Sequence, residues 1–129
     1  MIAIDTCSLL HYLGGSRGDD VEAVAQALSL GTAVLPPVVL SELLSDAALP
    51  DAIRDLITAI PLLQLGGDYW RRAGLLRSIV TRAGRKARLA DCLVAQSCID
   101  SNVTLITRDR DFGVFVGRGL RLAIRPRRV

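Results

Sequence analysis

The chain opens with a short apolar run, residues 1–4, that ends in the carboxylate of Asp5. The small polar residues Thr6 and Ser8 follow almost directly. This pattern is typical of a buried strand that passes through a turn into a helix. We therefore expect Asp5 to lie at the carboxyl end of a strand. Open α/β sheets bind ligands at that edge, because loops and helix N-termini converge there.

Segments with the patterns of helices and strands alternate along the rest of the chain. Helices are expected where apolar residues follow the helical period, at residues 9–13, 21–28, 37–44, 51–60, 69–83 and 89–100. Strands are expected at the short apolar runs of residues 32–35, 61–65, 103–106 and 120–124. Asp19 or Asp20, and Asp68, are suited to cap helices, and Gly31 and Gly84 are suited to end them.

The alternation of strands and helices predicts the fold class. Strands that are separated by helices pair in parallel through right-handed crossovers. The expected fold is therefore α/β, a three-layer α/β/α sandwich around a central, mostly parallel sheet. The chain has 129 residues without an internal repeat, a linker or a low-complexity segment, so we expect a single domain over residues 1–129.

Composition excludes several classes of protein. With 50% hydrophobic and 22% charged residues, the chain has the composition of a soluble globular protein. No apolar run approaches the roughly 18 residues of a membrane span, and the N-terminus lacks the features of a signal peptide. We expect a cytoplasmic protein with no membrane contact. Cys7, Cys92 and Cys98 form no CxxC pair, so they are expected to be small core residues rather than a disulfide framework or a zinc site.

Charge is distributed unevenly along the sequence. Residues 1–68 hold two basic and nine acidic side chains, a net charge of −7, whereas residues 69–129 hold fourteen basic and four acidic ones, a net charge of +10. All but one of the sixteen basic residues are arginine, the side chain best suited to bidentate phosphate contact, although the codon usage of a GC-rich genome would also favour arginine. The chain ends in a basic tail at residues 125–128. This asymmetry indicates a surface that binds a polyanion.

Four acids are predicted to meet at one edge of the sheet. Asp5 and Asp109 follow strands, and Glu42 and Asp91 lie in the first turns of helices. Each alone could be a helix cap, a complement to a helix dipole or a turn residue. Together they would repel one another, and a hard divalent cation such as Mg²⁺ or Mn²⁺ would relieve that repulsion. Such an ion can activate water for attack on a phosphodiester.

Four short segments resemble the motifs of a known nuclease family. They are Ile-Asp-Thr-Cys-Ser-Leu-Leu (4–10), Val-Leu-Ser-Glu-Leu (39–43), Leu-Ala-Asp-Cys-Leu-Val-Ala (89–95) and Leu-Ile-Thr-Arg-Asp-Arg-Asp-Phe (105–112). In sequence and order they resemble the motifs of PIN-domain nucleases. The compact length is most similar to the toxin ribonucleases of VapBC-type toxin-antitoxin modules. The resemblance spans essentially the whole chain.

This resemblance implies a PIN-like fold and Mg²⁺- or Mn²⁺-dependent cleavage of RNA, for which transfer RNA and ribosomal RNA are candidate substrates. It also implies a homodimer and a cognate VapB-type antitoxin whose peptide occupies a groove near the metal site. The catalytic and metal-binding roles fall to Asp5, Glu42, Asp91 and Asp109. Asp5 and Asp91 are expected to be direct ligands, with Glu42 assisting through water or proton transfer. Family members often have Asn in place of Asp109, so Asp111 can share or exchange the fourth role.

Other residues are expected to support these acids. Thr6, Ser8 and Thr107 are expected to orient carboxylates or metal-bound waters through hydrogen bonds. The side chains expected to contact RNA are Arg85, Lys86, Arg88, Arg108 and Arg110. His11 is interpreted as a partly buried structural residue rather than a general base. Trp70 is expected to pack in a helix pair or a dimer contact rather than to stack on a base.

Four alternatives compete with a ribonuclease. The chain could be a catalytically inactive PIN-like module that binds RNA or protein. A phosphatase with an aspartyl nucleophile would need a second Asp two residues after Asp5, where Cys7 stands. A receiver-like domain would need an acidic pair near the N-terminus and a suitably placed lysine, but the chain has only Lys86. A dinucleotide-binding fold would need a G-x-G-x-x-G motif after the first strand, and none is present there.

Overall fold

The computed structural model describes residues 1–123. The basic tail predicted at residues 125–128 and the end of the last predicted strand, at residue 124, lie outside the described residues. The elements in chain order are β1 (Ile2–Ile4), α1 (Thr6–Leu13), α2 (Asp19–Leu30), β2 (Ala33–Val34), α3 (Pro37–Leu44), α4 (Asp51–Thr58), α5 (Tyr69–Arg82), α6 (Leu89–Ser101), β3 (Thr104–Ile106), the 3₁₀ helix η1 (Arg110–Arg118) and β4 (Arg121–Leu122).

The four strands form one sheet in the order β2-β1-β3-β4, and every pair is parallel. In the central pair, Ile4 of β1 is opposite Ile106 of β3. Both side chains are fully buried, and the residues that follow them, Asp5 and Thr107, therefore emerge side by side at the carboxyl edge. The predicted α/β fold with a parallel sheet is confirmed.

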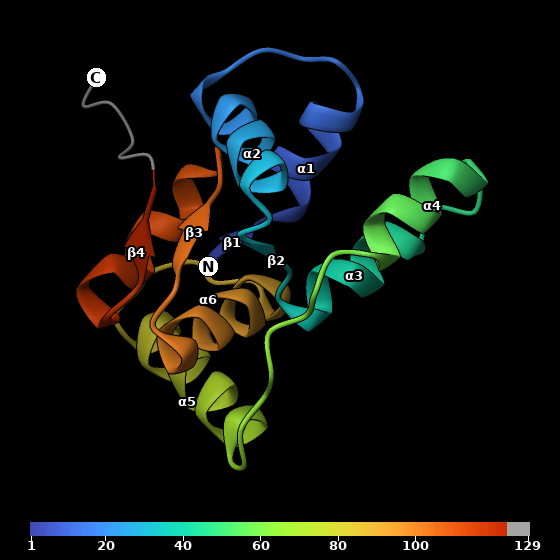
Figure 1. The fold of residues 1–129 in the computed structure, drawn as a ribbon. Helices are drawn as coiled ribbons and strands as arrows, with labels where there is room; N and C mark the ends of the chain where they lie inside the picture. The colour runs from blue at the N-terminus through green and yellow to red at the C-terminus, as the bar shows by residue number, and fades with distance from the viewer. Residues whose placement is uncertain (124–129) are drawn as a thin grey trace.

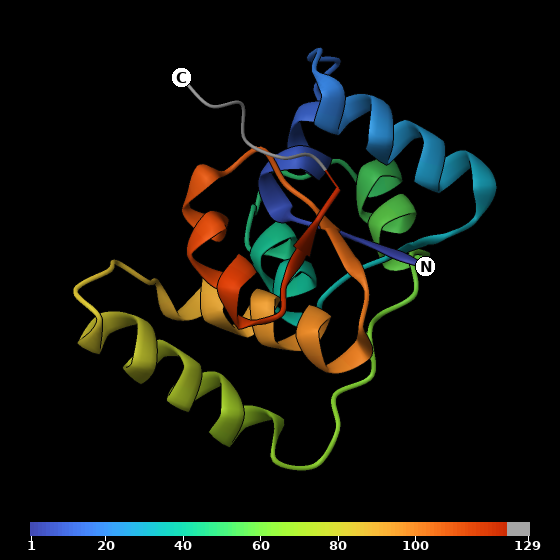
Figure 2. The ribbon, with the colours of Figure 1, turned by 90° about the vertical axis from the view of Figure 1, so that its left-hand side faces the viewer.

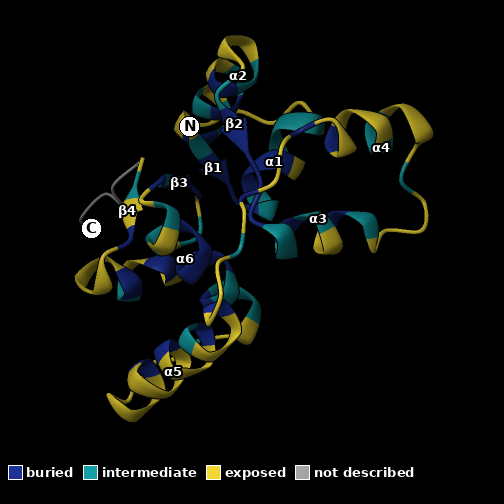
Figure 3. Cartoon of the chain, turned by 60° about the horizontal axis from the view of Figure 1, so that its bottom comes forward, coloured by how far each residue is buried: buried dark blue, intermediate teal, exposed yellow. Residues whose placement is uncertain are grey.

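Helices cover both faces of the sheet. Helices α1 and α2 lie on one face, and α6 lies on the other with α5 outside it (Figures 1 and 2). Because α6 lies between the sheet and α5, it is buried around most of its circumference, whereas α5 buries a single stripe (Figure 3). That stripe consists of Tyr69, Ala73, Leu76 and Val80. Within residues 1–123, no helix is both long and apolar enough to cross a membrane.

The core is mainly aliphatic. Its largest fully buried side chains include Ile4, Leu9, Leu105 and Ile106 from the first motif and the central strands. Cys92 and Cys98 are buried among them as expected, whereas Cys7 is only half-buried. The close packing of these side chains makes the strands a rigid support for the residues at their ends.

The segment expected to be a strand at residues 61–65 forms only an isolated parallel bridge, between Leu35 and Leu62. Two hydrogen bonds make this bridge, from the Leu35 N–H to the Pro61 carbonyl and from the Leu63 N–H to the Leu35 carbonyl. Proline has no N–H to donate, and Gly66 and Gly67 then turn the chain away. The prediction of a strand here was wrong because the partner segment stops at Leu35, where Pro36 and Pro37 follow and have no N–H to extend the ladder.

Two of the predicted helix caps also differ. Gly18, not Asp19 or Asp20, is the N-cap of α2, and Asp20 lies in its first turn, where its side chain binds elsewhere. Asp68 does stand at the N-cap of α5, in a left-handed backbone conformation, but its carboxylate lies 3.3 Å from the Arg71 guanidinium rather than on the helix amides. The 3₁₀ helix η1 was not predicted, because its sequence has two glycines, which disfavour a helix.

Substitution of alanine for glycine should have opposite effects on stability at the end of α2 and inside α5. Gly31 ends α2 with φ of 68°, so Gly31→Ala forces a strained conformation on a side chain and should lower the free energy of unfolding by about 1 kcal/mol. Gly74 lies inside α5 with open space around its Cα, so Gly74→Ala should raise that free energy by about 0.5 kcal/mol. Urea denaturation measures both variants. If both substitutions change the free energy of unfolding in the same direction, this explanation is wrong.

Candidate functional site

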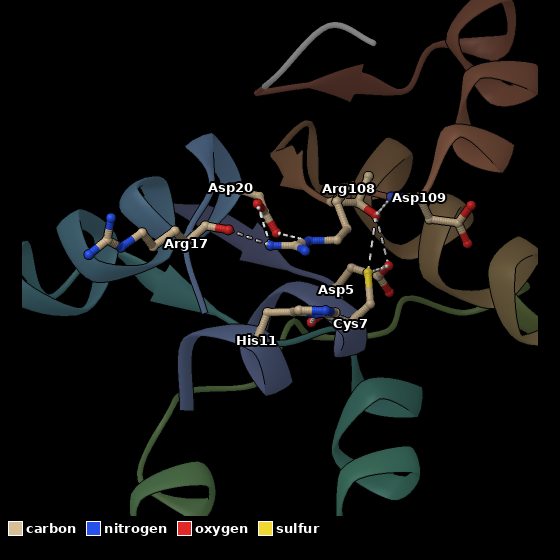
Figure 4. Close-up of polar contacts among 8 residues, drawn as sticks. Asp5, Cys7, His11, Arg17, Asp20, Arg108 and Asp109 are labelled. Carbon is tan, nitrogen blue, oxygen red and sulfur yellow. Dashed lines mark hydrogen bonds and ion pairs between the residues drawn. The ribbon is translucent and has the colours of Figure 1, made fainter. Parts of the chain in front are cut away.

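Asp5 is held at the carboxyl edge of the sheet by bonds on both sides. Its N–H donates to the carbonyl of Ile106 (2.9 Å), which extends the pairing of β1 and β3 by one residue. Asp5 as a whole is only 6% exposed, and its Oδ2 accepts hydrogen bonds from Thr107 Oγ1 (2.8 Å) and Cys7 Sγ (3.2 Å). Asp5 stands at the N-cap position of α1, but its carboxylate makes no capping hydrogen bond and lies beside the Cys7 thiol (Figure 4).

Thr107 connects two of the predicted acids. Its buried hydroxyl donates to Asp5 and accepts from the N–H of Asp109 (3.0 Å). In turn, Oδ1 of Asp109 accepts from the N–H of Asp111 (2.9 Å), so that Asp109 caps η1. The turn after β3 therefore has a fixed shape in which Thr107 is hydrogen-bonded to both Asp5 and Asp109.

Glu42 reaches the same region from α3. Its exposed side chain accepts a hydrogen bond at Oε1 from Thr6 Oγ1 (2.9 Å), at the start of α1. Thr6 therefore binds the Glu42 carboxylate, and its role in a metal site stays a prediction. Ser8 does not reach these acids. Its hydroxyl is buried on the other side of α1, forms no hydrogen bond within the described residues, and lies near Asp20.

Asp91, in the first turn of α6, experiences the charges of all three other acids. Burial is the largest cause that raises the pKa of its carboxyl to about 6. The negative charges of Asp109, Asp5 and Glu42 also raise it, and the positive charge of Arg88 opposes them. The pKa of Asp5 is likewise raised, first by burial and also by Asp109, although its hydrogen bonds counteract this. The structure thus brings the four predicted acids into one electrostatic cluster.

This cluster suits a hard divalent cation in charge and in ligand type. Its donors are carboxylate oxygens, the ligands that Mg²⁺ and Mn²⁺ prefer, and their mutual repulsion would be relieved by a cation. Within residues 1–123, however, no group of three His, Cys, Asp or Glu side chains is arranged to hold a metal ion. The carboxylates of Asp5 and Glu42 are instead hydrogen-bonded to Thr107 and Thr6.

A basic cavity of about 610 Å³ adjoins the acids. The residues that line it are Arg77, Thr81, Arg85, Lys86, Ala87, Arg88, Asp91 and Asp111. Arg77 Nε donates to the carbonyl of Ala87 (3.0 Å) and so holds the basic loop between α5 and α6 against α5. A smaller cavity of about 250 Å³ adds Arg110 to Arg85 and Lys86. Positive side chains therefore surround the approach to Asp91.

The sequence reasoning missed several residues of this region. Arg77 and Thr81 lie in the middle and last part of α5, and only the antiparallel packing of α5 on α6 brings them near Asp91. Cys7 was expected to be a core residue, yet its thiol donates to Asp5. Arg108 was expected to contact RNA, but its guanidinium binds Asp20 instead. The pattern of a single sequence carries no signal for such contacts between distant segments.

His11 and Trp70 occupy different environments. His11 is half-buried, with Nδ1 2.6 Å from the Cys7 carbonyl oxygen, which agrees with the structural role expected of it. Trp70 is 68% exposed and makes an edge-to-face contact with Tyr69, with ring centroids 5.1 Å apart. It is therefore not packed in a helix pair of its own chain, and the dimer contact stays a prediction.

Comparisons with known proteins agree with this fold. The sequence profile of the PIN domain family matches residues 2–116. No curated protein sequence is significantly similar to the chain. Among solved structures, VapBC2 from Rickettsia felis bound to a DNA fragment from their promoter is similar with a TM-score of 0.71 and 20% identity, covering 95% of this chain and 97% of that one.

Two further structures are similar. FitAcB from Neisseria gonorrhoeae has a TM-score of 0.72 and 20% identity over 95% of this chain and 96% of that one. VapBC-5 from Mycobacterium tuberculosis, a member of the VapBC family of toxin-antitoxin systems, has a TM-score of 0.54 and 25% identity over 70% of this chain and 82% of that one. The likenesses at 20% identity establish a shared fold.

The raised pKa of Asp91 predicts a stability that depends on pH. Between pH 3.8 and about 6 the folded chain binds a proton at Asp91 more readily than the unfolded chain, so this carboxyl lowers stability as pH rises through that window. Asp91→Asn should therefore raise the free energy of unfolding at pH 7.5 in metal-free buffer by about 1 kcal/mol, a value reduced because the carboxyl is half exposed.

Urea denaturation at pH 7.5 and pH 3.5 measures this effect, and the gain should vanish at the lower pH. Asp68→Asn, at an exposed carboxylate paired with Arg71, is the control and should show no such gain at pH 7.5. An Asp91→Asn variant that is less stable than the parent at pH 7.5 would show that the acids do not repel one another in the folded chain.

Proposed function

The chain belongs to the PIN domain family, and on that premise we propose that it is a metal-dependent endoribonuclease that cleaves RNA phosphodiester bonds. We further propose that it is the VapC-type toxin of a type II toxin-antitoxin system. PIN domains are generally nucleases. The observation that carries the proposal is that the charges of Asp5, Glu42 and Asp109 all raise the pKa of Asp91, and that Asp91 lines a basic cavity.

In this proposal the acids hold Mg²⁺ or Mn²⁺. The chemistry that such an ion supplies is a more acidic water and neutralisation of the charge that gathers on the phosphate. Asp5 and Asp91 are the proposed direct ligands, and Glu42 assists through water or proton transfer. The raised pKa of Asp91 supports this assignment, because a carboxyl destabilised by neighbouring acids gains the most from a cation.

Asp109 is proposed as the fourth acid in preference to Asp111. The charge of Asp109 raises the pKa of both Asp5 and Asp91, which places it within their electrostatic reach. The carboxylate of Asp111 is exposed and lines the basic cavity. The backbone N–H of Asp111 donates to the carboxylate of Asp109. Asp111 therefore supports Asp109 by fixing its side chain, while Thr107 and Cys7 fix Asp5.

The basic cavity is the proposed path of the RNA strand. Arg85, Lys86 and Arg88 line it next to Asp91, and Arg110 extends the positive surface into the neighbouring cavity. Arginine binds phosphate through two parallel hydrogen bonds, so a strand that follows these side chains would place a phosphodiester at the acids. Arg77 belongs to the same surface, although its Nε is engaged with the Ala87 carbonyl.

The proposed partners are a cognate VapB-type antitoxin and a second copy of the chain. The similar structures from Rickettsia felis and Mycobacterium tuberculosis are VapBC proteins, which supports an antitoxin partner. On the outer surface of α5 and the start of α6, large apolar side chains are exposed, namely Trp70, Leu75, Ile79 and Leu89. Large exposed apolar side chains are more frequent at protein–protein interfaces than elsewhere on a surface, which supports the proposed homodimer.

Asp91→Asn tests the proposed chemistry. The substitution keeps the size of the side chain but removes a metal ligand, so RNA cleavage in Mg²⁺ or Mn²⁺ should fall at least about 100-fold while the circular dichroism spectrum is unchanged. Asp68→Asn is again the control and should cleave normally. Full activity of the purified Asp91→Asn protein would reject the assignment. If the unaltered chain binds RNA or protein but never cleaves RNA with either ion, the inactive PIN-like module is the better interpretation.

Arg85→Ala combined with Arg88→Ala tests the proposed RNA path. The loss of two phosphate contacts should raise KM about ten-fold, reduce kcat less, and lower the slope of log KM against log salt concentration by roughly one to two. The matched control is Arg71→Ala with Arg118→Ala, which removes the same charge from positions outside both cavities. Equal effects of the two double variants would mean that only total charge matters.

A further inference from the structure

Arg108 stands between two residues of the site but points away from it. Its neighbours in the chain are Thr107 and Asp109, whereas its side chain extends across to the start of α2 (Figure 4). There, Nε donates to Oδ2 of Asp20 (2.8 Å) and Nη2 donates to Oδ1 (3.0 Å). Nη2 also lies 3.3 Å from the carbonyl oxygen of Arg17. This is a bidentate ion pair between segments 88 positions apart in sequence.

The burial of Asp20 and the geometry of its hydrogen bonds both favour the ion pair with Arg108. Asp20 is only 5% exposed, so its carboxylate depends on Arg108 to compensate for lost hydration. Although burial alone would raise the pKa of Asp20, the hydrogen bonds and charge of Arg108 hold it below its ordinary value, with a further contribution from the nearby Ser8 hydroxyl. Both oxygens of the carboxylate accept from the guanidinium, the geometry that makes such pairs strong and directional.

Gly18 allows the loop before α2 to pass close to the pair. Its φ is 150°, a conformation that side chains rarely adopt. A Cβ at this position would stand 2.6 Å from Asp20 Oδ1 and 3.1 Å from Arg108 Nη2. The loop, the carboxylate and the guanidinium therefore pack with no room for another group.

We propose that Arg108 and Asp20 are positioning residues that hold the Thr107–Asp109 turn against Asp5. The side chain of Arg108 fixes the middle residue of that turn. On either side of it, the Thr107 hydroxyl binds the Asp5 carboxylate, and the Asp109 N–H binds the Thr107 hydroxyl. Loss of the ion pair frees the turn and with it the relative position of Asp5 and Asp109. This inference rests on the proposed function and replaces the RNA contact first expected of Arg108.

If Arg108 and Asp20 position the turn, their substitution should have effects that the loss of an ordinary structural ion pair does not have. The pair between Arg72 and Asp100 (2.6 Å) joins α5 to α6 away from the acids, so Arg72→Ala is a matched control for the loss of an ion pair. Arg110→Ala is a control for the loss of an RNA contact from the same loop. Arg108→Lys keeps the charge but not the bidentate geometry, and Asp20→Asn keeps the shape but not the charge.

The test compares Arg108→Ala, Arg108→Lys and Asp20→Asn with the two controls. Hydrogen exchange of the Asp109 amide in metal-free protein should be about ten-fold faster in Arg108→Ala and Asp20→Asn, with Arg108→Lys intermediate and Arg72→Ala unchanged. Mn²⁺ affinity should fall about ten-fold in Arg108→Ala and Asp20→Asn, less in Arg108→Lys, and not at all in Arg72→Ala. In RNA cleavage, the variants of Arg108 and Asp20 should have a lower kcat, while their KM stays within about two-fold of the parent value. Arg110→Ala should instead raise KM.

Unchanged amide exchange and Mn²⁺ affinity, together with a raised KM in Arg108→Ala, would overturn the proposal and return Arg108 to RNA binding. If Arg108→Ala fails to fold, Arg108→Lys and Gly18→Ala, which crowds the pair but keeps both partners, give the same measurements. If the unaltered chain neither binds Mn²⁺ nor cleaves RNA, the proposed function fails. Even then, hydrogen exchange of the Asp109 amide decides whether the Arg108–Asp20 ion pair orders the turn.

Discussion

The pairing of β1 with β3 is the interaction on which the rest of the structure depends. Ile4 and Ile106 are opposite one another and fully buried, so the register of the two strands is fixed by the core. A slip by one residue would turn these side chains out of the core and separate Asp5 from Thr107. The hydrogen bond between Thr107 and Asp5, across 102 positions of sequence, exists only because this register is held.

The acids at this edge oppose the stability that the core provides. Asp5 and Asp91 both have raised pKa values, with burial as the first cause and neighbouring carboxylates as a second. Hydrogen bonds from Thr107, Cys7 and Thr6 offset part of this cost by stabilising particular carboxylates. A chain selected only for stability would not gather these charges. Their retention at one edge is what supports a chemical role for it.

Much of this arrangement could be predicted from sequence, because it follows from local pattern. Asp5 and Asp109 come after short apolar runs, and Asp91 begins a helix, so parallel pairing alone directs them to one edge. The environment of Arg108 could not be predicted in this way, since Asp20 is distant in sequence and resembled a helix cap. The contribution of Arg77 to the basic cavity depends on how α5 packs on α6, which is a tertiary contact. The segment around Leu62 forms only a bridge and not a strand, because its partner Leu35 is followed by two prolines that cannot donate to a ladder.

The position of β3 late in the chain has a consequence for biosynthesis. β1 and α1 are synthesised well before the strand that pairs with β1 in the centre of the sheet, which begins at Thr104. Until that strand is available, Asp5 lacks its hydrogen-bond partner and Asp109 is not yet near it. A partly synthesised chain therefore has no assembled acidic edge. Any activity of that edge begins only after β3 and the turn that follows it have been synthesised, because this strand completes both the core and the acidic edge.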